Sequence, residues 1–441
     1  MGNGKNLIGT KKPGRKNARG GFLSSANPSV ALVFSACGEM MKKIFYGWWI
    51  VFACFLIGFY VSSTVFYGFT AFFEPLIQEF GWSYAQVSFA ASLRGLEMGI
   101  LAFPVGFIVD RFGARKLMLS GVIAVGFGLL LLSATRSLFT FYAAFLLMAF
   151  GAGGCTSVVT LSAVADWFDK NVGKAIGVMA SGFGASGLMI PLIVWLIAAY
   201  GWRSTLVILG VGMWVLGIPL SFIIRENPRS SENSEGKPSN LSRGLGEEAK
   251  EKAGVGFREI LKNRSFLYLN LVEAIRMMVV SAVITHVMPF LSSMAISRTT
   301  AGFVAAAIPL SSIIGRIGFG WAADLFEKRK VMACGFIVMG VGLLTFCGVN
   351  WTWMLVPFLL LFPPSYGGMI VLRGAIVRDY FGRESFGKMI GMVMGSSSVG
   401  SILGPTLAGW AFDTVGSYLF IWIAFSASLG LSTLLVLRIR R

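Results

Sequence analysis

Twelve stretches of about 20 apolar residues limit the fold of this chain more than any other feature. In a lipid bilayer every backbone polar group must find its partner within the protein, so such stretches form helices or the strands of a closed barrel. The apolar runs are continuous and lack the alternation of barrel strands, which excludes a barrel. Only 13% of the 441 residues are charged, about half the share of a soluble domain. The sequence therefore predicts an all-α integral membrane protein.

Short polar segments separate the apolar stretches, which is typical of neighbouring helices packed antiparallel. The expected helices cover residues 46–73, 84–109, 117–134, 138–165, 173–198, 203–224, 266–291, 299–322, 331–348, 352–378, 386–410 and 418–437.

The two halves of the chain are related by an internal repeat. The segment 106–116 recurs at 320–330, an offset of 214 residues, and the same offset relates Pro75 to Pro289. Solenoid repeats are much shorter, about 20–50 residues, so the pattern indicates a duplicated half and a bundle of six helices in each. In membranes this design is typical of transporters. The expected regions are a basic tail at 1–45, a first bundle at 46–224, a linker at 225–264, a second bundle at 265–437 and a basic tail at 438–441.

The net charge of +18 does not indicate nucleic-acid binding, because its distribution follows membrane topology. Each loop takes the number of the expected helix that it follows. Of the 38 Lys and Arg residues, 31 lie in the terminal tails and the even-numbered loops. The odd-numbered loops hold only Arg136, Arg203 and Arg298. This bias places both termini in the cytoplasm of a protein in the cell membrane.

Two patterns that could suggest a cofactor have simpler explanations. The segment Gly182–Gly187 matches a dinucleotide-binding pattern, but it lies within an apolar helix and lacks the preceding strand. Small residues of this kind let helices approach closely in a membrane. The single histidine, His286, and five scattered cysteines cannot form a metal cluster of the usual spacing. No cofactor and no metal is expected.

Charged residues inside apolar helices are the clearest indication of a binding site, because each is costly to bury in lipid. Arg94 and Glu97 are three residues apart, as are Glu273 and Arg276. Each couple can form an ion pair on one helix face. Either the pairs are structural, or their members contribute to binding or coupling.

Arg316 differs because its helix contains no acidic residue before Asp324, eight positions later. An unpaired arginine in a membrane cavity can bind a carboxylate through the two parallel donors of its guanidinium group. Arg373 lies near the cytoplasmic end of its helix, where extension to the interface or pairing is expected, with contact to the substrate as the alternative. His286 either satisfies a carbonyl group in its neutral form or contributes to substrate binding or pH sensing.

The repeated segment resembles the loop motif of the major facilitator superfamily. The matching residues of the first copy are Gly106, Asp110, Arg111, Gly113 and Arg115, and those of the second copy are Gly320, Asp324 and Arg329. The first copy has Ala114 where the motif commonly has Arg, and the second copy lacks the Arg after Asp324. The resemblance covers residues 46–438. It implies that these residues act as a gate on the cytoplasmic side, whereas positive charge alone would only orient the loop.

Within that superfamily, the segment 315–324 is similar to helix 8 of the oxalate/formate antiporters and monocarboxylate transporters. That resemblance implies that Arg316 engages the carboxylate of the substrate. The chain has serines at 396–398 where oxalate antiporters have a Lys in helix 11, which disfavours a dianion. It has Ser312 where monocarboxylate transporters have an Asp, so a coupled proton would require Glu97 or Glu273.

The expected function is secondary active transport of a small organic anion, most simply a monocarboxylate, by alternating access. Arg316 is the expected main receptor, and the secondary candidates are Arg276, Arg94 and His286. A proton or counter-anion is a possible partner, the protein is expected to be a monomer, and no enzymatic activity is expected. Efflux of amphipathic compounds is the alternative within transport, because aromatic residues and methionines are abundant. A receptor that does not transport is the alternative from another class.

Overall fold

The structure is a computed structural model that describes residues 45–95, 105, 108–109, 111–168, 172–225, 263–348, 351–381 and 386–439. All regular elements among these residues are helical. The first half contains α2 (Gly47–Val61), η1 (Ser62–Tyr67), η2 (Gly68–Phe72), α3 (Phe73–Phe80), α4 (Tyr84–Leu93), α6 (Ala114–Ser133), α7 (Leu138–Cys155), α8 (Ser157–Ala165), α9 (Val172–Ala185), η4 (Ser186–Met189) and α10 (Ile190–Ile223). The second half contains α15 (Arg264–Ser293), α16 (Arg298–Leu325), α17 (Lys328–Cys347), η6 (Thr352–Met354), α18 (Leu355–Phe381), α19 (Phe386–Val415) and α20 (Leu419–Leu437).

The helices confirm the predicted fold class. Ten helical segments of the described chain are long and apolar enough to cross a membrane. One of them, Lys174–Ile223, contains two of the predicted spans, because the backbone at Gly201 leaves the helical conformation (φ 77°, ψ 163°). Helix α4 is the described beginning of the span predicted at 84–109. The arrangement therefore agrees with the predicted twelve spans of an all-α membrane protein.

The first span ends later than its hydropathy predicted. The sequence placed its end near residue 73, but the helix continues through a π segment and a 3-10 segment to Phe80. Polar side chains such as Glu74 and Glu79 lower the hydropathy there without interrupting the helix. Gly81 ends it in the left-handed conformation (φ 65°), which glycine adopts without steric cost. Hydropathy thus marks the apolar part of this span, and the glycine marks the end of the helix.

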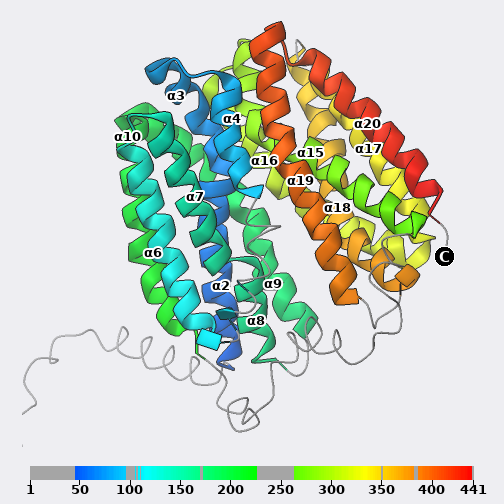
Figure 1. Ribbon diagram of the computed structural model, residues 1–441, viewed down its shortest axis with the longest axis horizontal. Coiled ribbons are helices and arrows are strands. Elements are labelled where there is room, and N and C mark those ends of the chain that lie inside the picture. The colour runs from blue at the N-terminus through cyan, green and yellow to red at the C-terminus, as the bar shows by residue number, and fades with distance from the viewer. Residues whose placement is uncertain are drawn as a thin grey trace, which may run out of the picture. The chain divides into compact units, whose positions relative to one another are not determined.

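The two halves meet mainly at one end of the molecule. We call it the Gly81 end, and it contains the turns at 81–83, 134–137, 294–297 and 416–418. The opposite end, the Gly113 end, contains the turn at Gly113 and the residues that flank the linker. Figure 1 shows the helices of the two halves close together around α4, α16 and α19 at the Gly81 end and separated toward the Gly113 end.

The glycine pattern at 182–187 serves helix packing, as predicted. A Cβ atom on Gly187 would lie 2.1 Å from the carbonyl oxygen of Ala306 in α16, and one on Gly182 would lie 2.5 Å from the carbonyl oxygen of Phe55 in α2. Backbones this close leave no room for a side chain. The same short segment therefore brings α9 against its own bundle and η4 against the other half.

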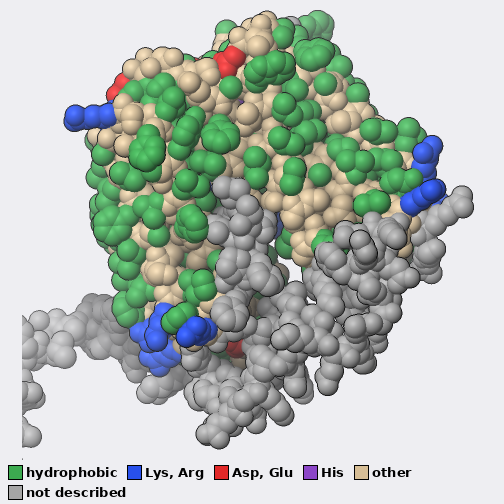
Figure 2. Space-filling view, in the orientation of Figure 1, with side chains coloured by type: hydrophobic (Ala, Val, Ile, Leu, Met, Phe, Trp, Pro, Cys, Tyr) green, Lys and Arg blue, Asp and Glu red, His purple; other side chains and the backbone are tan. Residues whose placement is uncertain are grey.

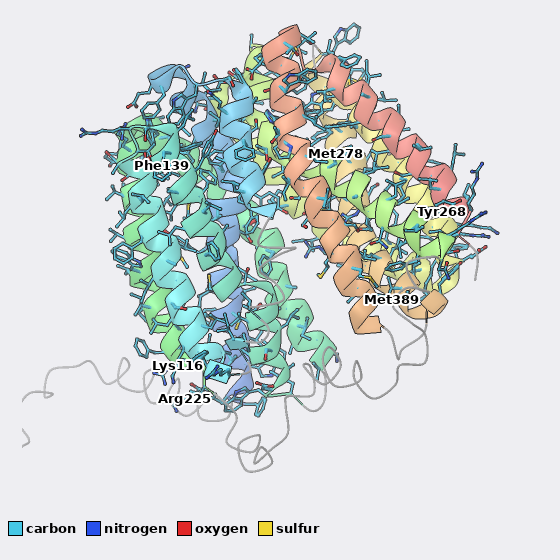
Figure 3. The ribbon with its side chains drawn as sticks, viewed as in Figure 1. Lys116, Phe139, Arg225, Tyr268, Met278 and Met389 are labelled. Atoms are coloured by element: carbon cyan, nitrogen blue, oxygen red, sulfur yellow. The ribbon has the colours of Figure 1, made fainter. Side chains whose placement is uncertain are left out.

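Hydrophobic side chains cover the molecule between its ends. Figure 2 shows a broad band of them on one face, with the Lys and Arg side chains that are visible there at its lower and lateral margins. Figure 3 shows Phe139 at the Gly81 end, and Lys116 and Arg225 at the Gly113 end. This distribution suits a helical protein whose sides face lipid and whose basic residues gather mainly at one end.

Candidate functional site

Asp413 of α19 joins the two halves at the Gly81 end. Its carboxylate oxygens accept hydrogen bonds from the backbone N–H groups of Tyr84, at 2.9 Å, and Ala85, at 2.8 Å. These groups open α4, where the helix dipole favours a negative charge. The side chain of Ser83 also caps this helix through the N–H group of Gln86. A residue of the second half therefore completes the cap of a helix in the first half.

Replacing Asp413 with Ala is expected to weaken the closure of the Gly81 end. Loss of a cap of this kind costs about 1 kcal/mol, which corresponds to a roughly fivefold shift in a two-state population. Spin labels at Arg136 and Val415 would report the separation of the halves by pulsed electron paramagnetic resonance. The fraction of long distances should rise in Asp413→Ala. Thr414→Ala, one residue further along, should leave the distribution unchanged, because the Thr414 hydroxyl donates to the Trp410 and Ala411 carbonyls of its own helix.

His286 lies at the same end and is completely buried. Its Nε2 atom lies 2.9 Å from the carbonyl oxygen of Pro405 and 2.9 Å from Ser88 Oγ, and its Nδ1 atom lies 3.0 Å from the Tyr418 hydroxyl. A carbonyl can only accept, so Nε2 donates, and in the neutral ring Nδ1 then accepts from Tyr418. The neutral ring thus has partners for both nitrogen atoms and links Ser88 of the first half to the second half. This placement gives His286 a structural contact, while a substrate contact stays a prediction.

Arg94 follows α4 and is also buried. Its Nη1 atom donates to the carbonyl oxygens of Val65 and Phe66, at 2.6 and 2.7 Å, and its Nη2 atom lies 3.3 Å from Thr285 Oγ1 of α15. The π segment η1 leaves those carbonyl groups available, since its hydrogen-bond pattern differs from that of an α-helix. In this conformation Arg94 stabilises the irregular part of the first span. Its predicted role in substrate binding stays a prediction.

Arg316 lies on the part of α16 that packs against α18. It is half-buried, and its Nε atom has no hydrogen-bond partner among the described residues. Its guanidinium group interacts electrostatically with the Tyr67 hydroxyl. That hydroxyl lies 2.5 Å from the Tyr366 hydroxyl, so η1 of the first half and α18 of the second half meet here. No acidic side chain of the described chain pairs with Arg316, in agreement with the lack of an acidic residue on its helix before Asp324.

The backbones of α16 and α18 approach each other closely next to Arg316. A Cβ atom on Gly315 would lie 1.7 Å from the carbonyl oxygen of Pro364, so only glycine permits this contact between α16 and α18. By contrast, a Cβ atom on Gly318 would meet nothing within 4 Å. At a rise of 1.5 Å per residue, Arg316 lies about 14 Å from the end of α16. A cationic group with an unused donor therefore lies about a third of the way along α16 from its Gly113 end.

A second cationic group lies within the second half. Glu273 and Arg276 of α15 form the predicted pair, with 2.7 Å between Glu273 Oε2 and Arg276 Nη2, and both side chains are buried. Arg373 of α18 joins them, with its Nη1 atom 3.6 Å from Glu273 Oε2. Of the outcomes expected for Arg373, the structure shows pairing, while a contact with substrate stays a prediction. We call Glu273, Arg276 and Arg373 the triad.

The predicted gating residues lie partly outside the described chain. Gly106 and Asp110 are outside it, and so is Glu97, one of the two candidates for proton coupling. The guanidinium groups of Arg111 and Arg115 lie over the rings of Phe112 and Phe222, and Gly113 adopts a φ of 82°, which glycine tolerates.

In the second copy of the motif, Arg329 donates to the carbonyl oxygens of Leu437 and Ile439 and pairs with Glu327. The neighbouring Lys330 and Arg329 hold the pKa of the Glu327 carboxyl below its usual value. Gly320 lies within α16, and Asp324 is exposed near the end of that helix. Within the described chain, the motif makes no hydrogen bond or ion pair between the halves. The gating role of the motif residues stays a prediction.

Sequence reasoning missed Tyr67 and Tyr366 and did not pair Arg373 with Glu273. Both tyrosines carry a polar hydroxyl within an apolar span, and this feature of the sequence could have marked them as candidate site residues. Nothing in the linear order links Tyr67 with Tyr366, which is 299 positions away. The contact depends on how the halves meet.

This fold, with two groups of membrane helices and polar groups buried between them, defines a class of transporters. A sequence profile of the Major Facilitator Superfamily matches residues 49–297 and 274–441. The chain belongs to the major facilitator superfamily and is a multi-pass membrane transporter. The predicted family is thereby confirmed.

Several curated relatives match most of the chain. An uncharacterized transporter of the same superfamily from Bacillus subtilis, YcxA, is 26% identical over 84% of this chain and 89% of its own length. Monocarboxylate transporter 12 of Xenopus laevis is 25% identical over 85% of this chain and 84% of its own length. Its human counterpart is 25% identical over 89% of this chain and 80% of its own length. These relatives are transporters, and the resemblance to monocarboxylate transporters agrees with the predicted one.

Solved structures share the fold at low sequence identity. A bacterial homologue of the human lysosomal transporter Spinster, in an inward-facing and unoccupied conformation, has a TM-score of 0.69 at 17% identity and covers 90% of this chain and 98% of its own. The nucleoside transporter NupG has a TM-score of 0.71 at 12% identity, with coverages of 90% and 100%. At these identities the similarity concerns the fold alone.

Proposed function

We propose that this protein transports a small monocarboxylate across the cytoplasmic membrane, with Arg316 as the carboxylate receptor. The observation that supports the proposal most is the half-buried Arg316, which has an unused Nε donor and no acidic partner among the described residues. A carboxylate would supply the missing charge and acceptors. The similarity to monocarboxylate transporters of animals supports the same substrate class.

We further propose that the described conformation opens toward the cytoplasm. The polar contacts between the halves that carry this proposal join residues near the Gly81 end or at mid-depth, and Figure 1 shows the helices of the two halves separated toward the Gly113 end. The basic residues that flank the linker support a cytoplasmic location of the Gly113 end. In this state a carboxylate would reach Arg316 from the cytoplasm.

Of the two acidic residues proposed for proton coupling, the structure describes only Glu273. Its carboxylate accepts hydrogen bonds from Arg276 Nε and Nη2, which favours a role as a counter-ion in this state. Uptake driven by a pH gradient in Glu97→Gln, Glu273→Gln and the double variant would assign the proton site. Undiminished pH-driven uptake by the double variant would exclude both residues.

Uptake of radiolabelled acids into proteoliposomes tests the function directly. The panel contains formate, lactate, pyruvate, oxalate and an aromatic acid, each with and without a pH gradient. Saturable uptake of a monocarboxylate supports the proposal. Absence of uptake of every acid, in sealed vesicles with folded protein, contradicts it and favours efflux of an amphipathic compound. Binding without flux would indicate a receptor.

Replacing Tyr67 with Phe is expected to raise the KM for the transported acid about fivefold, the effect of one lost hydrogen bond of about 1 kcal/mol. The ring remains, whereas the hydroxyl that lies 2.5 Å from Tyr366 and beside Arg316 is removed. Initial uptake rates over a range of substrate concentrations provide the measurement. Tyr142→Phe, whose hydroxyl contacts the Gln86 carbonyl elsewhere in the first half, should keep the original KM. Equal KM values for all three proteins would remove Tyr67 from the site.

A further inference from the structure

The triad has an unbalanced positive charge. Two guanidinium groups share one carboxylate, and Glu273 and Arg276 are 0% and 1% exposed while Arg373 is 13% exposed. Arg276 Nη1 and Arg373 Nε have no hydrogen-bond partner among the described residues. A buried charge without a partner costs several kcal/mol. The described side chains therefore leave one positive charge and two N–H donors unsatisfied.

The helix α18 connects the triad with the proposed substrate site. Arg373 lies seven residues after Tyr366 on this helix, so the two residues share one face and are about 10 Å apart along the axis. The chain runs toward the Gly113 end here, and Arg373 is about 12 Å from the end of the helix. The triad is thus displaced from the level of Tyr366 toward the Gly113 end.

We propose that the triad is a second anion-binding site, which holds a small monovalent anion between Arg276 Nη1 and Arg373 Nε. A single negative charge neutralises the excess, and its acceptor atoms satisfy both unused donors. The Glu273 carboxylate keeps Arg276 in place and limits the excess to one charge, so a dianion would be disfavoured. Either a carboxylate or a halide has the required chemistry.

The position suggests what this site does during transport. We infer that an anion that enters from the Gly113 end passes along this face of α18 and reaches the triad about 10 Å before the level of Tyr366, so that the triad serves as an intermediate station on the path. This role rests on the proposed transport function, whereas anion binding at the triad does not.

Equilibrium binding of radiolabelled formate tests the site, at an ionic strength held constant with the bulky sulfonate HEPES. The background is Arg316→Gln, which removes the proposed receptor and leaves the triad intact. We expect this variant to retain saturable formate binding and the additional change Arg373→Gln to abolish it. Arg298→Gln in the same background is the matched control, since Arg298 donates to the Ala71 carbonyl at the Gly81 end. Displacement by chloride would indicate an inorganic anion, and displacement only by the transported acid would indicate the substrate.

Two results would overturn the proposal. One is the absence of saturable binding in folded Arg316→Gln, and the other is unchanged binding after Arg373 is also replaced. Crystals of the unmodified protein soaked in bromide provide a measurement that needs no variant. An anomalous peak between Arg276 and Arg373 is expected, and its absence at saturating bromide would count against the site. Neither experiment requires flux, so a failure of the transport proposal would be recognised separately.

Discussion

Uptake of the transported acid is expected to fall by about 30-fold or more when Arg316 is replaced by Gln. Removal of one partner of a desolvated charge pair costs about 2–5 kcal/mol, and each 1.4 kcal/mol is a factor of ten. Glutamine keeps the approximate size of the side chain but lacks the charge and the fork of parallel donors. The measurement is the initial rate of saturable uptake into proteoliposomes that contain equal amounts of folded protein.

Two further variants make this experiment specific to Arg316. Arg298→Gln removes the same charge from the same helix α16, but its guanidinium group bonds to the Ala71 carbonyl at the Gly81 end. Its uptake should stay far above that of Arg316→Gln. Arg316→Lys should lie between Arg316→Gln and the unmodified protein, because it keeps a charge without the planar fork. Equal losses in Arg316→Gln and Arg298→Gln would show a general effect of lost charge on α16.

Replacing Glu273 with Ala is expected to lower the free energy of unfolding by about 3–5 kcal/mol. The change leaves Arg276 buried without its counter-ion, at a position where the guanidinium group is 1% exposed. Arg373 loses its nearest carboxylate at the same time. Reversible unfolding of the purified protein in mixed micelles containing sodium dodecyl sulfate provides the measurement.

Glu79→Ala is the control for this prediction. It also removes a carboxylate paired with an arginine, Arg203, at the same distance of 2.7 Å, but these side chains are 42% and 37% exposed. An exposed pair contributes about 0–1 kcal/mol. Similar losses in the two variants would mean that burial of the triad does not determine its contribution to stability.

The sequence predicted the features that depend on local composition. Apolar length identified the spans, and the charge bias and the repeat identified the two halves. The spacing of Glu273 and Arg276 predicted their ion pair because residues three apart lie on one helix face. The isolation of Arg316 was also visible, since no acidic residue lies within two turns of it on α16.

Features that depend on contacts between helices could not be predicted. The bond between Tyr67 and Tyr366 requires both the close approach of α18 to Gly315 and the meeting of the two halves. Arg373 was placed near the interface because of its distance from Asp379, yet it turns toward Glu273 on another helix. The helical extension to Phe80 was missed because hydropathy reports lipid exposure, not helix length.

The bonds of Asp413 with α4 and of His286 with Ser88 raise a question of energy balance. A protein that alternates between two conformations keeps them within a few kcal/mol of each other. Under the proposed alternating access, opening the Gly81 end would break these bonds, so the alternative conformation would have to form contacts of similar total strength elsewhere. The repeated motif near Gly113 has the charges to supply them. The two ends would then be thermodynamically coupled, and a change at either end would alter the apparent affinity for substrate from both sides of the membrane.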